Sequence, residues 1–176
     1  MQAENNSRRA LGTEFLKECI ADALIRLMEQ KPYDKITVRE ITDCANVGRA
    51  TYFRRFSSKD DVLSYKIKIL WRRWEKENKL DKKLVYTKEN FIRFFEFIYS
   101  VKDICAVFLK AEKLDVLILA LSTEFGIGEP SDPEEFYRFK YVMFGIVGVL
   151  TEWIKRNYLE SPKEMIDYLS GTIPMA

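Results

Sequence analysis

The side chains best suited to binding an anionic polymer gather in one segment, residues 37–56 (TVREITDCANVGRATYFRRF). Its second half brings together Arg49, Thr51 and Arg54 within six residues. Arginine can donate two hydrogen bonds to a guanine edge, and threonine or arginine can bind a backbone phosphate. Ala50 is small enough to let a helix approach base edges closely. These residues predict a DNA-reading helix, although a helical hairpin with a solvated basic face has the same pattern.

Two short helices and a tight turn must position these side chains. The first helix begins at a capping box, Thr37-Val-Arg-Glu40, and we expect it to run to about Ala45. Residues 46–48 (Asn-Val-Gly) break the pattern, because Asn and Gly tolerate the positive φ of a tight turn. A second helix is expected from Arg49 to about Phe56. This order is typical of a helix-turn-helix reader.

The apolar positions of the segment indicate which face is buried. The inward positions are Ile41, Ala45, Val47, Tyr52 and Phe56, which can pack against a preceding helix. The outward positions of the second helix are Arg49, Ala50, Phe53 and Arg54. Thr37 with the first amides of its helix, and Lys59 at the next helix start, suit backbone phosphates.

Helical periodicity covers nearly the whole chain, which predicts an all-α fold. An amphipathic stripe runs from Phe15 to Met28 and ends at Lys31-Pro32. Further helices are expected at about 58–74, 88–100, 104–125, 132–158 and 161–170. The highly charged stretch 72–83 is expected to be a solvated helix end and a linker. Residues 126–130 (GIGEP) are expected to be a plain connector, because a phosphate loop needs a preceding strand and a following Lys-Ser/Thr.

The composition excludes several classes of function. The chain has 176 residues and no histidine, so His-based catalysis and His-ligated zinc or haem are excluded. Cys19, Cys44 and Cys105 are too far apart for a CxxC pair and fit buried thiols in a reducing compartment. We found no Gly-rich nucleotide loop and no acidic cluster with metal spacing. An enzyme is therefore the weakest hypothesis, and we expect no cofactor and no metal.

Charge separates the two ends of the chain. Residues 36–74 carry nine basic and four acidic side chains (9 − 4 = +5), whereas residues 76–176 carry 14 and 16 (14 − 16 = −2). An anionic partner is thus expected at one end only. The most apolar run, 142–150, has nine residues, short of the ~20 that span a bilayer. The polar N-terminus lacks a signal-peptide core, so we expect a cytoplasmic protein without membrane contact.

With the helix before it and the SSKDDVL stretch after it, this segment resembles the tetracycline-repressor (TetR) family of bacterial transcription regulators. The residues in register with the family pattern are Ile36-Thr37-Val38, Ile41, Ala45, Val47, Thr51, Phe56, Lys59 and Val62-Leu63. The departures are Asn46 for a turn Gly, Gly48 for a capping Ser, Ala50 for a Gly, and an inverted pair at Tyr52-Phe53. The inversion removes the phosphate-binding hydroxyl expected at position 53, for which Tyr52 or Arg54 could substitute.

The resemblance implies a helix-turn-helix domain at 9–57 (motif 37–56) and a C-terminal helical ligand-binding and dimerisation domain at 58–176. It also implies a homodimer that binds a palindromic operator in double-stranded DNA, with one recognition helix in each half-site. We expect a repressor released by a small, largely apolar ligand. The candidate DNA-contacting residues are Thr37, Arg39, Gly48, Arg49, Ala50, Thr51, Tyr52, Phe53, Arg54 and Lys59.

The C-terminal domain has two further candidate sites. The residues expected to line an apolar ligand pocket, with ordinary core as the alternative, are Phe91, Phe94, Phe95, Ile98, Phe108, Tyr137, Tyr141 and Phe144. The residues expected at the dimer interface are Gly145, Gly148, Trp153, Met165 and Leu169; the alternative is a helix buried within one subunit. The competing function is an all-helical dimeric protein-interaction module that no longer binds DNA.

Overall fold

A computed structural model describes residues 2–78, 88–124 and 131–170. All regular structure in these ranges is helical, which confirms the expected all-α fold. The chain divides into two compact units, Met1–Lys66 and Ile67–Ala176. The division falls inside a helix, whereas the expected domain boundary at 57–58 lies just before that helix.

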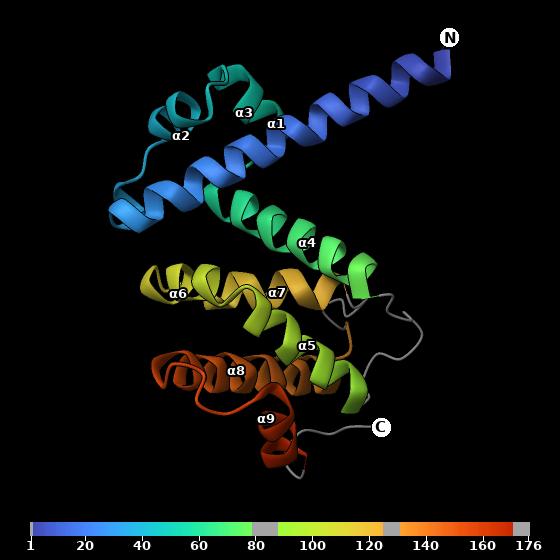
Figure 1. The fold of residues 1–176 in the computed structure, drawn as a ribbon, viewed down its shortest axis with the longest axis vertical. Coiled ribbons are helices and arrows are strands. Elements are labelled where there is room, and N and C mark those ends of the chain that lie inside the picture. Colours follow the sequence, from blue (N-terminus) through green and yellow to red (C-terminus); the bar gives the residue numbers. More distant parts are fainter. Residues whose placement is uncertain (1, 79–87, 125–130, 171–176) are drawn as a thin grey trace. The chain divides into compact units, whose positions relative to one another are not determined.

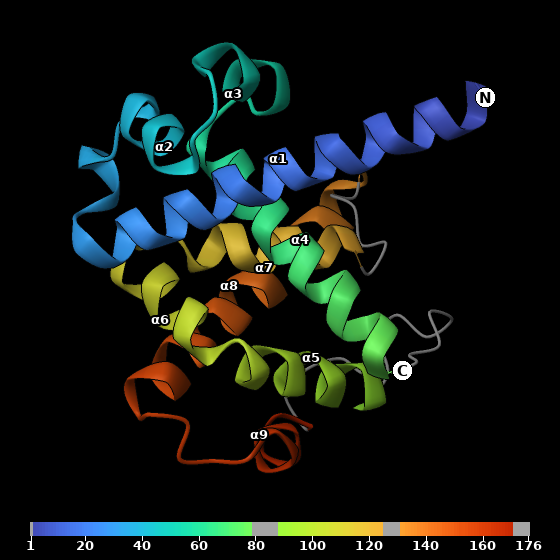
Figure 2. The same cartoon turned by 45° about the horizontal axis from the view of Figure 1, so that its top comes forward.

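The N-terminal unit holds the helix-turn-helix. It contains α1 (Gln2–Gln30), the 3-10 turn η1 (Tyr33–Lys35), α2 (Val38–Ala45), α3 (Arg49–Arg55) and the start of α4 (Lys59–Asn78). Both views show α2 running beside α1, with α3 following it (Figures 1 and 2). Fully buried side chains from three of these helices form the core: Ile20, Leu24, Ile41 and Leu63. Burial of this apolar surface orients the two short helices, which are too short to be stable alone.

In the described part of the C-terminal unit, the rest of α4 is followed by five helices. These are α5 (Lys88–Ser100), α6 (Lys102–Lys110), α7 (Leu114–Glu124), α8 (Pro133–Lys155) and α9 (Pro162–Leu169). α8 packs against α6 and α7, and α9 packs against α5 (Figure 2). The largest buried side chains are aromatic, with Phe95 and Trp153 in edge contact at 5.3 Å between ring centroids. The Asp132 cap and the capping box at Ser161 begin α8 and α9 where the sequence predicts them.

The single helix expected at 104–125 is wrong, because the chain forms α6 and α7 there. Glu112 adopts a left-handed conformation with φ 56°. The amide of Lys113 donates to the Phe108 carbonyl and that of Glu112 to the Leu109 carbonyl, at 2.9 and 3.0 Å. This pair of bonds is a Schellman termination, which usually has Gly at the left-handed position. A glutamate there gives no sequence signal for a helix end.

The C-terminal end of α8 is also formed by a residue in the left-handed conformation. Asn157 has φ 55°, and α8 ends at Lys155 instead of the expected Tyr158. In the stretch 72–83, expected to be a helix end and a linker, α4 continues to Asn78. The rest of that stretch and the expected loop at 126–130 lie outside the described residues. Within the described ranges, no helix is long and apolar enough to span a membrane, and no cluster of potential metal ligands forms.

Candidate nucleic-acid interface

The start of α2 is fixed by its own capping box. The Thr37 hydroxyl accepts from the Glu40 amide at 3.3 Å, while the Glu40 carboxylate accepts from the Thr37 amide at 2.9 Å. The Lys31 ammonium donates to the same carboxylate. These bonds, that of Lys31 foremost, lower the pKa of Glu40 to about 2. The hydroxyl of Thr37, a candidate phosphate contact, is therefore engaged within the subunit.

The turn between α2 and α3 uses Asn46 rather than Gly48 for its unusual backbone. Asn46 lies in the left-handed region with φ 52°, and the Val47 amide donates to the Thr42 carbonyl at 3.0 Å. Gly48 is extended, with φ −71°, and its carbonyl accepts from the Thr51 amide at 2.8 Å to begin α3. A Cβ at Gly48 would meet no atom within 4 Å. The positive φ expected in this turn is thus confirmed at Asn46.

The inner face of α3 holds the helix in place. Tyr52 is only 1% exposed, and its ring lies 6.0 Å from that of Phe56. Arg55 donates from Nη2 to the Thr13 hydroxyl at 3.1 Å, which ties α3 to α1. Although Tyr52 is among the candidate DNA contacts, its burial makes it a core residue that supports α3. Its hydroxyl has no hydrogen-bond partner among the described residues.

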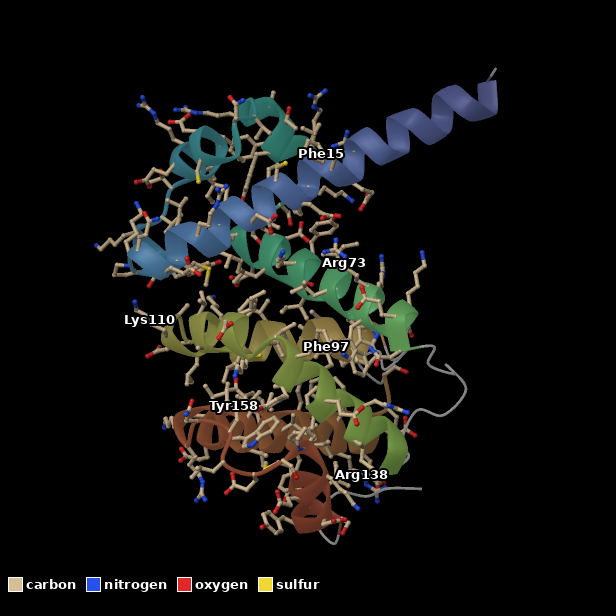
Figure 3. All side chains as sticks on the ribbon, viewed as in Figure 1. Phe15, Arg73, Phe97, Lys110, Arg138 and Tyr158 are labelled. Carbon is tan, nitrogen blue, oxygen red and sulfur yellow. The ribbon has the colours of Figure 1, made fainter. Side chains whose placement is uncertain are left out.

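The outer face of α3 is open to solvent. Its exposed side chains are Arg49, Ala50, Phe53 and Arg54. Arg54 curls along its own helix, with Nε 3.2 Å from the Ala50 carbonyl and Nη2 3.5 Å from the hydroxyl of half-buried Thr51. In Figure 3, nitrogen-tipped side chains project from α2 and α3 on the side away from α1. The outward set predicted for this helix is therefore assembled on one surface.

Two further candidates lie beside α3. Arg39 is exposed on α2 and is paired with Asp43 at 3.6 Å, an exposed ion pair of little strength. Lys59 instead serves the scaffold: its ammonium donates to the carbonyls of Tyr33 and Ile36 at 2.7 and 2.9 Å. It also lies 4.3 Å from the centroid of the Tyr33 ring. Lys59 thus attaches the first turn of α4 to the connection between α1 and α2.

Sequence reasoning missed a tyrosine that completes this attachment. The Tyr33 hydroxyl donates to the Asp60 carboxylate, 27 positions further along the chain. Burial, reinforced by this bond and the negative charge of Asp60, raises the pKa of Tyr33. No local pattern signals such a contact, because it forms only once α4 folds back on the turn before α2.

The residues predicted to line a ligand pocket lie in two separate environments. The side chains of Phe94, Phe95, Ile98 and Phe108 are buried in the core, whereas Tyr137, Tyr141 and Phe144 are exposed on α8. The side chain of Phe91 lies outside the described residues. The structure therefore does not bring the set together around one cavity. Core packing, the alternative interpretation, describes the buried members.

A shallow groove of about 150 Å³ lies between α7 and α8. Its lining residues are Asp115, Ile118, Leu119, Phe139, Lys140, Phe144 and Val147, and Phe144 alone among them was predicted to line a pocket. The walls are mainly apolar, with one carboxylate and one ammonium group. Such a groove suits a small apolar group with a polar end.

The residues predicted at the dimer interface also separate into two sets. Gly145 and Gly148 are exposed, and a Cβ at either would meet no atom within 4 Å. Trp153 is instead 1% exposed, and its Nε1 donates to the Glu160 carbonyl at 2.9 Å. Met165 is buried and Leu169 is half-buried. The two glycines thus lie on an open face of α8, whereas Trp153 and Met165 belong to the core.

Comparison with known proteins assigns the family. The sequence model of the family "Bacterial regulatory proteins, tetR family" matches residues 20–65, and that of a "Transcriptional regulator C-terminal region" matches residues 86–174. A search of curated proteins found no match. A solved structure, "Dihydroxyacetone kinase operon activator DhaS", is similar at 20% identity and a TM-score of 0.40, over 89% of this chain and 92% of that one. The chain belongs to the TetR family of transcriptional regulators, with a DNA-binding helix-turn-helix followed by a helical C-terminal region.

Proposed function

We propose that the protein is a homodimeric repressor that binds a palindromic operator through α3 and is released by a small, largely apolar ligand. The observation that carries the DNA-binding part is the outward face of α3. Arg49, Ala50 and Arg54 are exposed together on a helix whose inner face is anchored by Tyr52 and Phe56. A rigid short helix with cations and one small residue outward suits insertion into a major groove.

The open face of α8 supports the homodimer. Tyr137, Tyr141, Phe144 and Gly148 follow one another at spacings of four, three and four residues, so they share one stripe of the helix. The three aromatic side chains are each about 70% exposed, at 73%, 75% and 68%. A stripe of large apolar residues beside open glycines is an unusual surface for a monomer and suits a helix of a second copy.

The groove between α7 and α8 supports a small effector. Its volume of about 150 Å³ is below the ~300–1,000 Å³ of drug-sized pockets. Ile118 and Phe139 offer apolar walls, and Lys140 could pair with an anionic end of the ligand. Phe144 lines the groove and also belongs to the aromatic stripe, so a ligand there would change the packing of the dimer. Differential affinity of the ligand for two dimer arrangements would then change operator affinity.

Selection of bound duplexes from a random DNA library tests this function. The expected result is an enriched inverted repeat, whose affinity falls steeply as the salt concentration rises because phosphate contacts release counterions. A dimer that enriches no sequence, before and after refolding to strip bound ligand, would contradict the proposal. Addition of small aromatic or aliphatic acids to the complex then tests release.

The second candidate function is a dimeric protein-interaction module that no longer binds DNA. The observation that favours it is the pair Tyr52 and Phe53, because the hydroxyl is buried and the outward position is apolar. This module would give the same dimer in solution but equal, weak binding to every duplex. The same selection experiment therefore separates the two functions.

A further inference from the structure

Phe53 is the one large apolar side chain on the outward face of α3. Its ring is 66% exposed. Of the two residues next to it in the sequence, Tyr52 is buried and Arg54 is charged. The Phe53 ring makes an edge contact with the Tyr52 ring, at 5.4 Å between centroids. Because Tyr52 is locked in the core, this contact holds the Phe53 ring at a defined place on the surface.

Position 53 offers neither a hydrogen-bond donor nor an acceptor, so its partner must be apolar. The hydroxyl that could have served here belongs to Tyr52 and points into the core, without a partner among the described residues. Arg49 and Ala50 lie four and three positions before Phe53, on the same side of the helix. The ring is thus presented among cations, where an anionic polymer would be held against it.

Among the base edges of the major groove, the C5-methyl group of thymine is the apolar feature, and phenylalanine is one of the side chains that contact it. We propose that Phe53 is a specificity-determining residue that packs on the methyl group of one thymine in each operator half-site. This inference rests on the proposed DNA-binding function. It predicts that the selected inverted repeat contains a symmetric T·A pair at which the methyl group itself is read.

Replacement of thymine by deoxyuridine tests the contact, because it removes the methyl group and leaves the hydrogen-bonding edges unchanged. For the wild-type protein, deoxyuridine at the contacted position in one half-site should weaken binding roughly fourfold, and in both half-sites about fifteenfold, as expected for one buried methyl group each. A C·G pair at this position should bind weakly, and 5-methylcytosine there should recover part of the loss. The Kd of each duplex is measured at one salt concentration.

The variant Phe53→Ala assigns the effect to this side chain. It should bind the thymine and deoxyuridine duplexes equally, whereas Phe53→Leu, which keeps an apolar side chain, should retain part of the difference. Phe15→Ala serves as the matched control, because it removes another exposed phenylalanine of the N-terminal unit that lies on α1 and outside the proposed DNA-binding face, and it should preserve the discrimination. The deoxyuridine series on the wild-type protein needs no variant, so a folding defect in Phe53→Ala does not prevent the test.

Two results would overturn the inference while leaving the proposed function intact. One is an operator whose affinity is insensitive to deoxyuridine at every thymine. The other is a methyl effect of the same size in Phe53→Ala, which would assign the reading to another residue. If no duplex is enriched at all, the proposed function fails, and this inference fails with it.

Discussion

The ammonium of Lys31, just past the end of α1, donates a hydrogen bond to the carboxylate of Glu40, which closes the capping box of α2. One carboxylate therefore serves the cap of α2 and an ion pair with the chain that leaves α1. This contact joins the end of α1 to α2, the first helix of the helix-turn-helix. The charge state of the Glu40 carboxylate should therefore affect the stability of the whole DNA-binding unit.

The pKa of Glu40 gives a pH-dependent prediction. Hydrogen bonds from Lys31 and then Thr37 lower it from 4.5 to about 2. Because the folded-state pKa is depressed, the stabilisation is fully present above about pH 4.5 and is lost as the pH falls through about 2. Glu40→Gln should lower the midpoint of urea unfolding at pH 7. It should also reduce the fall of this midpoint as the pH decreases from about 4.5 to about 2.

The matched control is Glu164→Gln in the capping box of α9. Its carboxyl pKa is lowered by hydrogen bonds from Ser161, without the lysine that assists Glu40. The change in midpoint should therefore be smaller than for Glu40→Gln. Equal effects of the two variants would show that the bond from Lys31 adds nothing to the cap.

Two buried tyrosines should respond in opposite ways to loss of their hydroxyl. Tyr52→Phe removes a buried hydroxyl that has no partner among the described residues, and should stabilise the unit by roughly 1 kcal/mol. Tyr33→Phe removes the donor to Asp60 and should destabilise it by about 1–2 kcal/mol. Urea unfolding followed by circular dichroism measures both. Destabilisation by Tyr52→Phe would mean that the hydroxyl has a partner.

Local signals made several helix starts and the turn between α2 and α3 predictable. The capping boxes begin with Thr37 and Ser161, and the left-handed turn residue is Asn46; each is encoded within a few neighbouring positions. The outward face of α3 also follows from helical spacing alone. In contrast, Lys59 was expected at a phosphate but binds the carbonyls of Tyr33 and Ile36, because packing far along the chain decides its partner.

The C-terminal unit was less predictable, since apolar residues occupy several sides of α5 and α8. Aromatic density does not reveal which ring faces a neighbouring helix: Phe95 is buried and Tyr141 exposed, although both were expected to line one pocket. The turn at Glu112 escaped prediction because a left-handed glutamate is rare. Trp153 was expected at a subunit interface, but its indole bonds to the chain that leads into α9.

The exposed arginine at the start of α3 should dominate operator affinity. Arg49→Ala removes a cation from the outward face without disturbing the buried side, so folding should be unchanged. If it contacts a phosphate, the slope of log K against log salt concentration should fall by about one unit; if it reads a guanine, specificity at one base pair should relax at a cost of about 1–3 kcal/mol. Fluorescence anisotropy at four salt concentrations distinguishes the two.

The control for this variant is Lys155→Ala, which also removes one positive charge. Lys155 is exposed near the end of α8 and is paired with Glu152 at 3.0 Å. Its operator affinity and salt slope should equal those of the wild type. A similar loss of operator affinity in both variants would mean that Arg49 acts only through the net charge of the protein and not through a specific contact.

The burial of Trp153 predicts an effect on folding. Its ring packs against Phe95 and Tyr158, with centroids 5.3 and 4.9 Å away. Trp153→Ala should therefore destabilise the C-terminal unit by about 3–5 kcal/mol, as for other large-to-small changes in a core. Thermal unfolding measures this loss. A fully stable variant that is monomeric at all concentrations would instead place Trp153 between subunits.

Larger residues at Gly148 should have opposite effects on the stability of α8 and on dimerisation. Within one subunit, a Cβ at Gly148 meets no atom, and replacing an exposed helical glycine by alanine stabilises the helix by about 1 kcal/mol. If α8 of a second copy lies against this face, the methyl group of Gly148→Ala and the larger side chain of Gly148→Leu must push the two helices apart.

We therefore expect Gly148→Ala and Gly148→Leu to weaken dimerisation progressively, as measured by sedimentation equilibrium over a range of concentrations. Gly12→Ala, at an equally open glycine on α1, should leave the dimer unchanged. Dimers of undiminished affinity in both Gly148 variants would remove this face of α8 from the interface, because no close helix approach could survive a leucine at that position.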